Sequence, residues 1–296
     1  MVSHPIKNLL SGLVDYAGLF PPARLEMDPA VAEFARQRRT DEAWILGRFV
    51  VPTARLDELS AAMDRQRHPD DDGIWPLSAL VGGDPDEAKQ RIDAFDSAHA
   101  GRAAVTSIET KPATVDDVVR TAAAFDTLEV FYEIAYGRET APLLDAVAAH
   151  GGRAKIRTGG VTQDAFPSVA DVSRFIHAVR RADVPFKATA GLHHPLRGEY
   201  RLTYEDDAPD GTMHGFLNVF LAAAFVHQGA MRDTEVKELL GERRSGALDF
   251  SSVGVTWRGH RLSADELAAA RRTFVLSYGS CSFQEPVDDL KRLHLL

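Results

Sequence analysis

The chain has 296 residues, 45% of them hydrophobic, and a formal net charge of −9. This length suits two ordinary domains or one large α/β barrel, and no Ser/Pro-rich linker divides it, so we expect a single domain over residues 1–296. The acidic balance and the scattered arginine pairs disfavour nucleic acid and anionic membrane surfaces as partners.

A single cysteine, Cys281, excludes an intrachain disulfide and is consistent with a reducing compartment. A lone cysteine is more often a small packed residue than a nucleophile. The N-terminal segment lacks the long apolar core of a signal peptide, and the longest apolar run, at 216–226, is too short to span a bilayer. We therefore expect a cytoplasmic protein.

Short apolar, β-rich runs alternate with Ala-rich helical stretches along the chain. The predicted strands are 44–51, 75–81, 103–109, 128–135, 153–158, 185–190 and 250–257, with 15–20 or 274–279 supplying one more. Helix starts are indicated by Asp28-Pro29 and Asp84-Pro85, by TVDD (114–117) and by SADE (263–266).

This alternation predicts parallel βαβ units, and about eight of them predict a closed (β/α)8 barrel of the TIM type. A doubly wound open sheet is the alternative, but the chain has no G-x-G-x-x-G or Walker sequence. We expect the acidic segment YEDDAPDG (204–211) to act as a lid and the chain to end in a helical extension.

Polar side chains lie in or at the ends of four successive predicted strands, where barrel enzymes place their active sites. They are Glu109, Glu133, Lys155, Arg157, Lys187 and Thr189. Glu133 and Lys155 could simply neutralise one another in the barrel interior. Burying the whole set would be expensive, however, so the cluster favours a functional site.

Two lysines on adjacent strands are one arrangement that gives a reactive amine. Burial and a neighbouring cation both lower the pKa of a lysine, so that Lys187 beside Lys155 could attack a carbonyl and form a Schiff base. A carboxylate nearby, Glu109 or Glu133, could then move protons.

The segment KATAGL (187–192) resembles the Schiff-base segment of deoxyribose-phosphate aldolase and related class I aldolases. The resemblance implies that Lys187 is the Schiff-base lysine, that a second lysine tunes it and that an acid from an earlier strand shuttles protons. By position, Lys155 and Glu109 or Glu133 would fill these roles. In that family the second lysine lies on the strand after the Schiff-base lysine, whereas Lys155 precedes Lys187. The segments DYAGLFPPA, KIRTGG and GSCSFQEPV also resemble those of a bacterial barrel family, which implies no particular activity.

The segment RTGG (157–160) places Gly159 and Gly160 beside Arg157, a combination suited to a phosphate or carboxylate group. A plain glycine turn between strand and helix is the alternative. We expect Arg157, Thr189 and the two glycines to bind substrate.

Three histidines, His193, His194 and His214, admit two interpretations. They could line the mouth of the site and bind substrate, with His214 at the start of the helix after the lid. Alternatively, with Glu109 and Glu133 they could form a mixed nitrogen and oxygen site for a divalent metal ion. No spaced metal-binding signature supports the second interpretation.

The leading hypothesis is an aldolase-like lyase that needs no cofactor and forms a lysine Schiff base with a small polar carbonyl substrate, which could be anionic. The alternative is a divalent-metal-dependent isomerase or hydrolase, and a third hypothesis is a barrel that binds a ligand without catalysis. The sequence leaves a homo-oligomer open and does not identify the substrate.

Overall fold

The computed structural model describes residues 5–66, 73–135 and 140–296, so residues 1–4 of the N-terminal segment lie outside the described residues. Eight parallel strands close into a barrel in the order β1-β13-β7-β6-β5-β4-β3-β2. They are β1 (Val14–Tyr16), β2 (Leu46–Pro52), β3 (Trp75–Leu80), β4 (Ala103–Thr110), β5 (Glu129–Glu133), β6 (Arg153–Arg157), β7 (Phe186–Thr189) and β13 (Val275–Ser280). The expected (β/α)8 barrel is confirmed.

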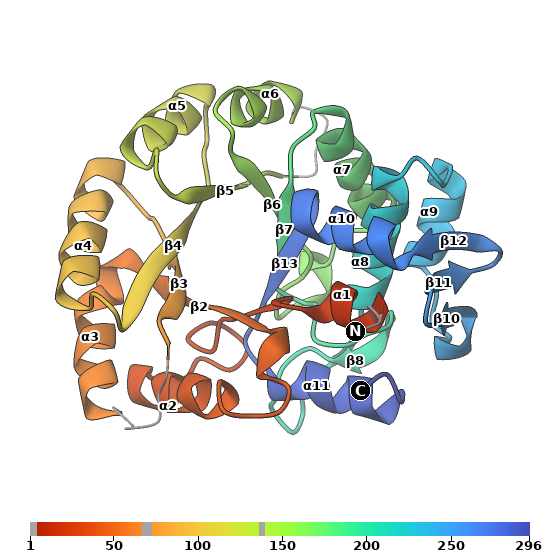
Figure 1. Cartoon of the computed structure of the whole chain (residues 1–296), viewed down its shortest axis with the longest axis horizontal. Helices are drawn as coiled ribbons and strands as arrows, with labels where there is room; N and C mark the ends of the chain where they lie inside the picture. Colours follow the sequence, from red (N-terminus) through yellow and green to blue (C-terminus); the bar gives the residue numbers. More distant parts are fainter. Residues whose placement is uncertain (1–4, 67–72, 136–139) are drawn as a thin grey trace.

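Helices follow the strands and cover the outside of the barrel, as Figure 1 shows. They are α2 (Met27–Gln37), α3 (Leu56–Arg65), α4 (Pro85–Ala98), α5 (Val115–Ala124), α6 (Ala141–Ala149), α7 (Val169–Arg181) and α11 (Gln284–Arg292). In α7, Val172, Phe175, Ile176 and Val179 are buried, a spacing that places them on one helical face. Helix α11 directly follows β13 and completes the eighth strand–helix pair.

Three of the helix starts indicated by the sequence are formed by side-chain caps, whereas Asp28 lies inside α2, whose N-cap is Glu26 and has no side-chain cap hydrogen bond. The Asp84 carboxylate accepts hydrogen bonds from the backbone N–H groups of Asp86 and Glu87. Thr114 and Ser263 each form a reciprocal capping box with the acid three residues later. Such caps satisfy N–H groups that have no partner within the helix.

The prediction of a barrel strand over 250–257 is wrong. Residues of this run form β10 (Leu248–Phe250) and β11 (Gly254–Trp257), which pair antiparallel in a separate sheet with β12 (His260–Ser263). Arg258 and Gly259, between β11 and β12, both have positive φ, which suits a tight hairpin turn. The barrel instead takes strands from both 15–20 and 274–279, namely β1 and β13.

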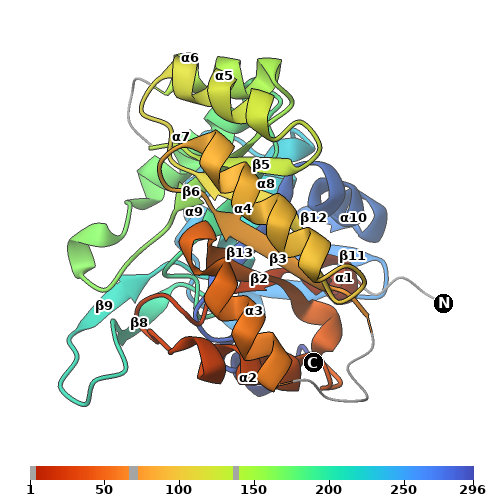
Figure 2. The ribbon, with the colours of Figure 1, turned by 90° about the vertical axis from the view of Figure 1, so that its left-hand side faces the viewer.

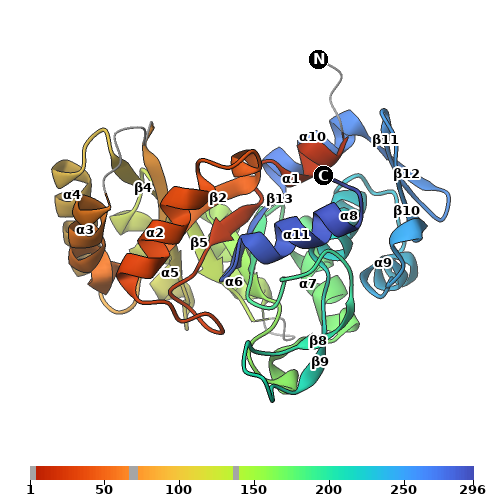
Figure 3. The same ribbon diagram turned by 90° about the horizontal axis from the view of Figure 1, so that it is seen from below.

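The chain leaves the barrel between β7 and β13 and returns only for the last strand. This excursion contains a hairpin of β8 (Gly198–Arg201) and β9 (Asp210–Met213), then α8 (Phe216–His227), α9 (Asp233–Leu240), the antiparallel sheet and α10 (Ala264–Thr273). Figure 2 shows the hairpin protruding, and Figure 3 shows it on the opposite side from α10 and the adjoining α1 (Pro5–Leu10). The expected lid, 204–211, therefore overlaps the segment that joins β8 to β9.

Helix α8 explains the longest apolar run of the sequence. Every residue from Phe216 to Val226 is buried, so the helix is enclosed on all sides within the protein. Among the described residues, no helix has both the length and the apolar character needed to cross a membrane.

Candidate active site

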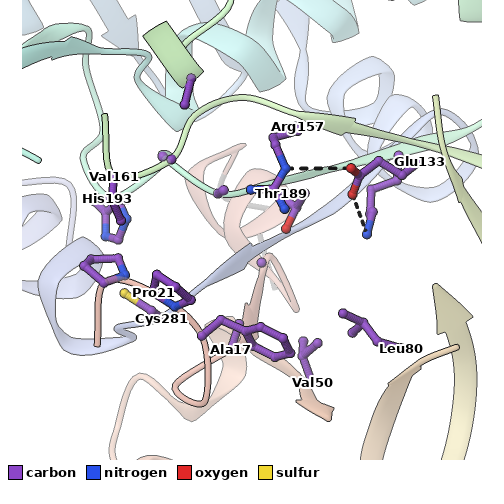
Figure 4. A pocket seen from close by; sticks show the side chains of 18 of the residues that line it. Ala17, Pro21, Val50, Leu80, Glu133, Arg157, Val161, Thr189, His193 and Cys281 are labelled. Atoms are coloured by element: carbon purple, nitrogen blue, oxygen red, sulfur yellow. Dashed lines mark ion pairs between the residues drawn. The ribbon is translucent and has the colours of Figure 1, made fainter. Parts of the chain in front are cut away.

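A cavity of about 370 Å³ opens at the carboxyl ends of the barrel strands. Its polar lining includes Glu109, Glu133, Lys155, Arg157, Thr189 and His193. Figure 4 shows Glu133 and Arg157 towards one end, His193 and Cys281 at the other, and Ala17, Val50 and Leu80 along one side of the cavity. The cavity therefore has two polar ends joined by an apolar surface.

Strand register brings the charged side chains together. Glu133 on β5 is paired with Lys155 on β6, and Lys155 is paired with Lys187 on β7. Residues directly opposite one another in neighbouring strands share a face of the sheet. Glu109 on β4 and Asp15 on β1 reach the same interior from more distant strands.

Lys187 lies at the inner end of the network and is completely buried. Its Nζ lies 2.5 Å from Asp15 Oδ2 and 2.7 Å from Glu109 Oε1. Ser277 Oγ donates a hydrogen bond to Asp15 Oδ2, and Ser78 Oγ donates one to Glu109 Oε1. The buried charges are therefore paired and hydrogen-bonded, as burial of charge requires.

Lys155 lies further out and lines the cavity, which Lys187 does not. Its Nζ lies 3.0 Å from Glu109 Oε2 and 3.0 Å from Glu133 Oε2. Arg157 continues the series, with Nε 3.7 Å from Glu133 Oε1 and a side chain that is 54% exposed. Negative and positive groups thus alternate from Asp15, in the core, to Arg157, at the opening.

The expected lowering of the Lys187 pKa is not what this environment produces. Burial alone would lower the pKa of Lys187, but the negative charges of Asp15 and Glu109 outweigh burial and raise it. Burial would raise the pKa of Glu109, yet Lys187 and Lys155 hold it far below its usual range. The pKa of Glu133 is also lowered, because Lys155 outweighs the effect of burial. Lys187 is therefore a buried ammonium whose nearest charged neighbours are carboxylates.

The two glycines of the predicted turn, Gly159 and Gly160, have different surroundings. Gly160 lines the cavity, whereas Gly159 packs against Gly191, and an added Cβ at Gly159 would lie 2.9 Å from Gly191 Cα. The Thr158 hydroxyl donates hydrogen bonds to the carbonyl oxygens of Thr189 and Ala190. The turns after β6 and β7 are thereby held together, and Gly159 supports the wall without lining it.

The three histidines do not form one group. His193 lines the cavity, with Nδ1 3.0 Å from Glu285 Oε2 on α11. His194 points elsewhere, with Nδ1 2.6 Å from Asp289 Oδ2 and its ring stacked on Tyr200. We expected both histidines to meet a ligand, but only His193 borders the cavity.

His214 is fully buried and lies just before α8, whose N-cap is Gly215. Its Nε2 lies 2.8 Å from the carbonyl oxygen of Pro167, and burial lowers its pKa to about 4. Among the described residues, no group of three or more His, Cys, Asp or Glu side chains is arranged to hold a metal ion. The alternative metal site of Glu109, Glu133 and histidines therefore finds no geometric support in that part of the chain.

Several members of the site were not predicted. Asp15 is not among the predicted site residues, and its signal is a carboxylate inside the fully buried strand Val14–Tyr16. Ser78 and Ser277 resemble ordinary strand residues. Glu285 lies on the helix after the last strand, and nothing in its local sequence indicates a partner 92 residues away.

Comparisons with known proteins do not assign a family. No family profile and no curated protein matches the chain. Solved structures that match include a lysine/ornithine decarboxylase from Vibrio vulnificus complexed with cadaverine (12% identity, 62% of this chain and 48% of that chain, TM-score 0.37). Another is mandelate oxidase with benzoyl-formic acid (12% identity, 90% of this chain and 78% of that chain, TM-score 0.38). A third is nitroalkane oxidase from Streptomyces ansochromogenes (15% identity, 64% of this chain and 61% of that chain, TM-score 0.33).

The chain spans about half the length of the decarboxylase. At TM-scores below 0.5 these similarities carry no argument about function. The assignment of the fold rests on the strand topology of the chain itself.

Proposed function

We propose that this protein is an aldolase-like lyase that forms a Schiff base between a lysine and a small polar carbonyl compound. The observation that carries the proposal is the position of Lys155, which lines the cavity with its Nζ between the carboxylates of Glu109 and Glu133. Nζ of Lys155 can reach a carbonyl carbon in the cavity, and the two carboxylates can accept and return the protons that addition of the amine requires.

The nucleophile in this proposal is Lys155 in place of Lys187. Lys187 has no exposed surface, its pKa is raised, and it does not line the cavity. Lys187 instead fixes Asp15 and Glu109 and adds positive charge beneath the site. With this assignment the second lysine, Lys187, lies on the strand after the Schiff-base lysine, as in the class I aldolases, but the Schiff-base lysine is no longer the one in the segment KATAGL.

The chemistry balances without a cofactor. The Lys155 ammonium passes one proton to Glu133, and the neutral amine forms a C–N bond to the carbonyl carbon while Glu133 returns the proton to the oxygen. A second proton from the nitrogen leaves with that oxygen as water, so an ammonium and a carbonyl give a protonated imine and water.

Carbon–carbon cleavage then requires a base and an electron sink. A carboxylate removes the proton of a hydroxyl group on the carbon that lies two bonds from the imine carbon, the bond between that carbon and its neighbour next to the imine carbon breaks, and an aldehyde leaves. The bonding electrons move to the imine nitrogen and give an enamine, which is protonated and hydrolysed to release Lys155. Arg157, exposed at the opening, suits a substrate that carries an anionic group.

Borohydride trapping tests the proposal. Protein incubated with pyruvate, dihydroxyacetone or erythrose and then reduced with cyanoborohydride should carry an adduct that peptide mapping locates at Lys155. Lys155→Met should abolish the adduct and reduce turnover on the order of 10⁴-fold or more, while circular dichroism stays unchanged.

Lys111, an exposed lysine that does not line the cavity, gives a matched control. Lys111→Met should leave trapping at Lys155 intact. An adduct located at Lys187, or trapping that survives in Lys155→Met at the wild-type rate, would contradict the assignment of the nucleophile.

A further inference from the structure

The end of the cavity remote from Lys155 contains a second arrangement of polar groups. His193 and Cys281 line the cavity there, and Glu285 lies behind His193. Tyr204, from the segment joining β8 and β9, donates a hydrogen bond to Glu285 Oε2 at 3.2 Å and lies 3.5 Å from Cys281 Sγ. The mechanism proposed above uses none of these residues.

The protonation of this group is set by its contacts. Burial would raise the pKa of Glu285, but the hydrogen bond from His193 is the largest of the effects that outweigh burial and lower the pKa, so the carboxylate is ionised near neutral pH. An ionised carboxylate only accepts hydrogen bonds, so Nδ1 of His193 carries the proton in this contact. The same contact fixes the plane of the imidazole ring.

The other ring nitrogen of His193, Nε2, has no hydrogen-bond partner among the described residues. In Figure 4 the ring lies beside Pro21 and Cys281 at the edge of the cavity. In the neutral histidine that donates from Nδ1, Nε2 is a hydrogen-bond acceptor. It therefore suits a hydroxyl group of a ligand.

We propose that His193 binds a hydroxyl group at the end of the substrate remote from Lys155, and that Glu285 and Tyr204 are positioning residues for it. This inference rests on the proposed function, because it takes Lys155 as the group that holds the carbonyl end. The apolar surface between the two ends, which includes Val50 and Leu80, would cover the carbon chain. The substrate class is then a polyhydroxylated carbonyl compound, such as a small sugar.

Two aldehydes with the same four-carbon chain distinguish binding at the Lys155 end of the cavity from binding at the His193 end. Erythrose carries hydroxyl groups and butanal carries none, so only erythrose can use His193. The rate of cyanoborohydride trapping at Lys155 is measured against the concentration of each aldehyde, which gives an apparent affinity and a limiting rate. We expect Glu285→Gln and His193→Ala to weaken the apparent affinity for erythrose roughly tenfold, the value of one well-placed hydrogen bond, and to leave butanal unchanged.

A matched control lies one helical turn further along α11. Asp289 holds His194, which does not line the cavity, as Glu285 holds His193. Asp289→Asn should not change the ratio of the two affinities, and Glu285→Asp should restore part of the preference for erythrose. A limiting rate that is unchanged in Glu285→Gln would show that the carboxylate acts on binding through His193 and not on the fold.

The possible failures are distinguishable. Equal weakening of both aldehydes in Glu285→Gln, or an unchanged ratio in both Glu285→Gln and His193→Ala, would overturn this inference and leave the Schiff base standing. Absence of any adduct in the wild-type protein with either aldehyde would overturn the proposed function and this inference with it.

Discussion

Two buried cations lie at opposite ends of the barrel, and they differ in what surrounds them. Arg271, on α10, donates hydrogen bonds to the backbone carbonyl oxygens of Leu9, Ser11, Val275 and Leu276, near the amino ends of β1 and β13. Lys187 contacts two carboxylates near the carboxyl ends of the strands. Burial of a cation is therefore not in itself the mark of a site.

The difference lies in the partners. Burial lowers the pKa of Arg271 to about 10, which leaves it a cation at neutral pH, and backbone carbonyl oxygens do not take up its proton. The partners of Lys187 are titratable and continue to Lys155, which lines the cavity. The arginine contacts only the backbone, whereas the lysine belongs to a network of titratable side chains that reaches the cavity.

Replacing each cation by methionine should have the largest effect and tests whether Lys187 and Arg271 differ in role. Lys187→Met leaves Asp15 and Glu109 buried without their shared cation, which should reduce the free energy of unfolding by about 3–5 kcal/mol. Arg271→Met leaves carbonyl oxygens without a donor, at about 1–3 kcal/mol for each unsatisfied group, so we expect a comparable loss. Urea unfolding at neutral pH measures both.

Trapping at Lys155 then separates the two variants. We expect it to slow on the order of 10²-fold in Lys187→Met and to stay at the wild-type rate in Arg271→Met, measured below the temperature at which either unfolds. Equal trapping in the two variants would show that the inner lysine is as purely structural as the arginine.

Lowering the pH should have an effect of intermediate size, and it should act on the network of Lys187 but not on Arg271. The folded pKa of Glu109 lies below its ordinary value of 4.5, so its stabilising contribution is complete above pH 4.5 and is lost as the pH falls towards the folded pKa. Glu109→Gln lacks this contribution, so its deficit relative to the wild type should shrink by about 1 kcal/mol per pH unit below pH 4.5. The deficit of Arg271→Met should stay constant over that range, because the arginine does not titrate there. Urea unfolding in steps between pH 6 and pH 3.5 measures both, and a constant deficit for Glu109→Gln would contradict the lowered pKa.

The smallest effect on stability is expected at the exposed end of the network. Arg157 is half exposed and lies 3.7 Å from Glu133, so Arg157→Met should change the free energy of unfolding by less than about 1 kcal/mol. Its effect should instead concern binding, with a weaker apparent affinity for pyruvate, an anion, and an unchanged affinity for uncharged dihydroxyacetone in the trapping assay. Equal changes for the two compounds would remove Arg157 from anion binding.

The sequence predicted the barrel and the inner part of the site because both depend on periodicity. Alternating polar residues at 155, 157, 187 and 189 lie on the face that parallel pairing turns inward, and the structure brings Glu109, Glu133, Lys155 and Lys187 together. The prediction of a barrel strand over 250–257 is wrong for a local reason, because a β-rich apolar run predicts a strand but not the sheet to which it belongs. The tight turn at Arg258-Gly259 carried the missing information.

The depth of each side chain and the long-range contacts could not be predicted in the same way. Periodicity predicts which face of a strand a side chain lies on, but not whether a lysine reaches the cavity. The sequence therefore favours Lys187 as the nucleophile, although Lys155 is the lysine that lines the cavity. His193 and His194 are adjacent in sequence, and only α11 decides which of them meets Glu285 and which meets Asp289. Such pairings depend on the docking of a helix formed some 90 residues later.

The closure of the barrel by β13 between β1 and β7 has a consequence for the order in which the protein can mature during synthesis. Asp15 is made early, Lys187 follows 172 residues later, and Ser277, which also contacts Asp15, is 262 residues away. On a ribosome that adds residues from the N-terminus, the first carboxylate of the site must therefore stay hydrated until nearly the whole chain has emerged. Contacts of this sequence separation form slowly, so the charged network should be among the last parts of the molecule to assemble, and its formation would report that the barrel has closed.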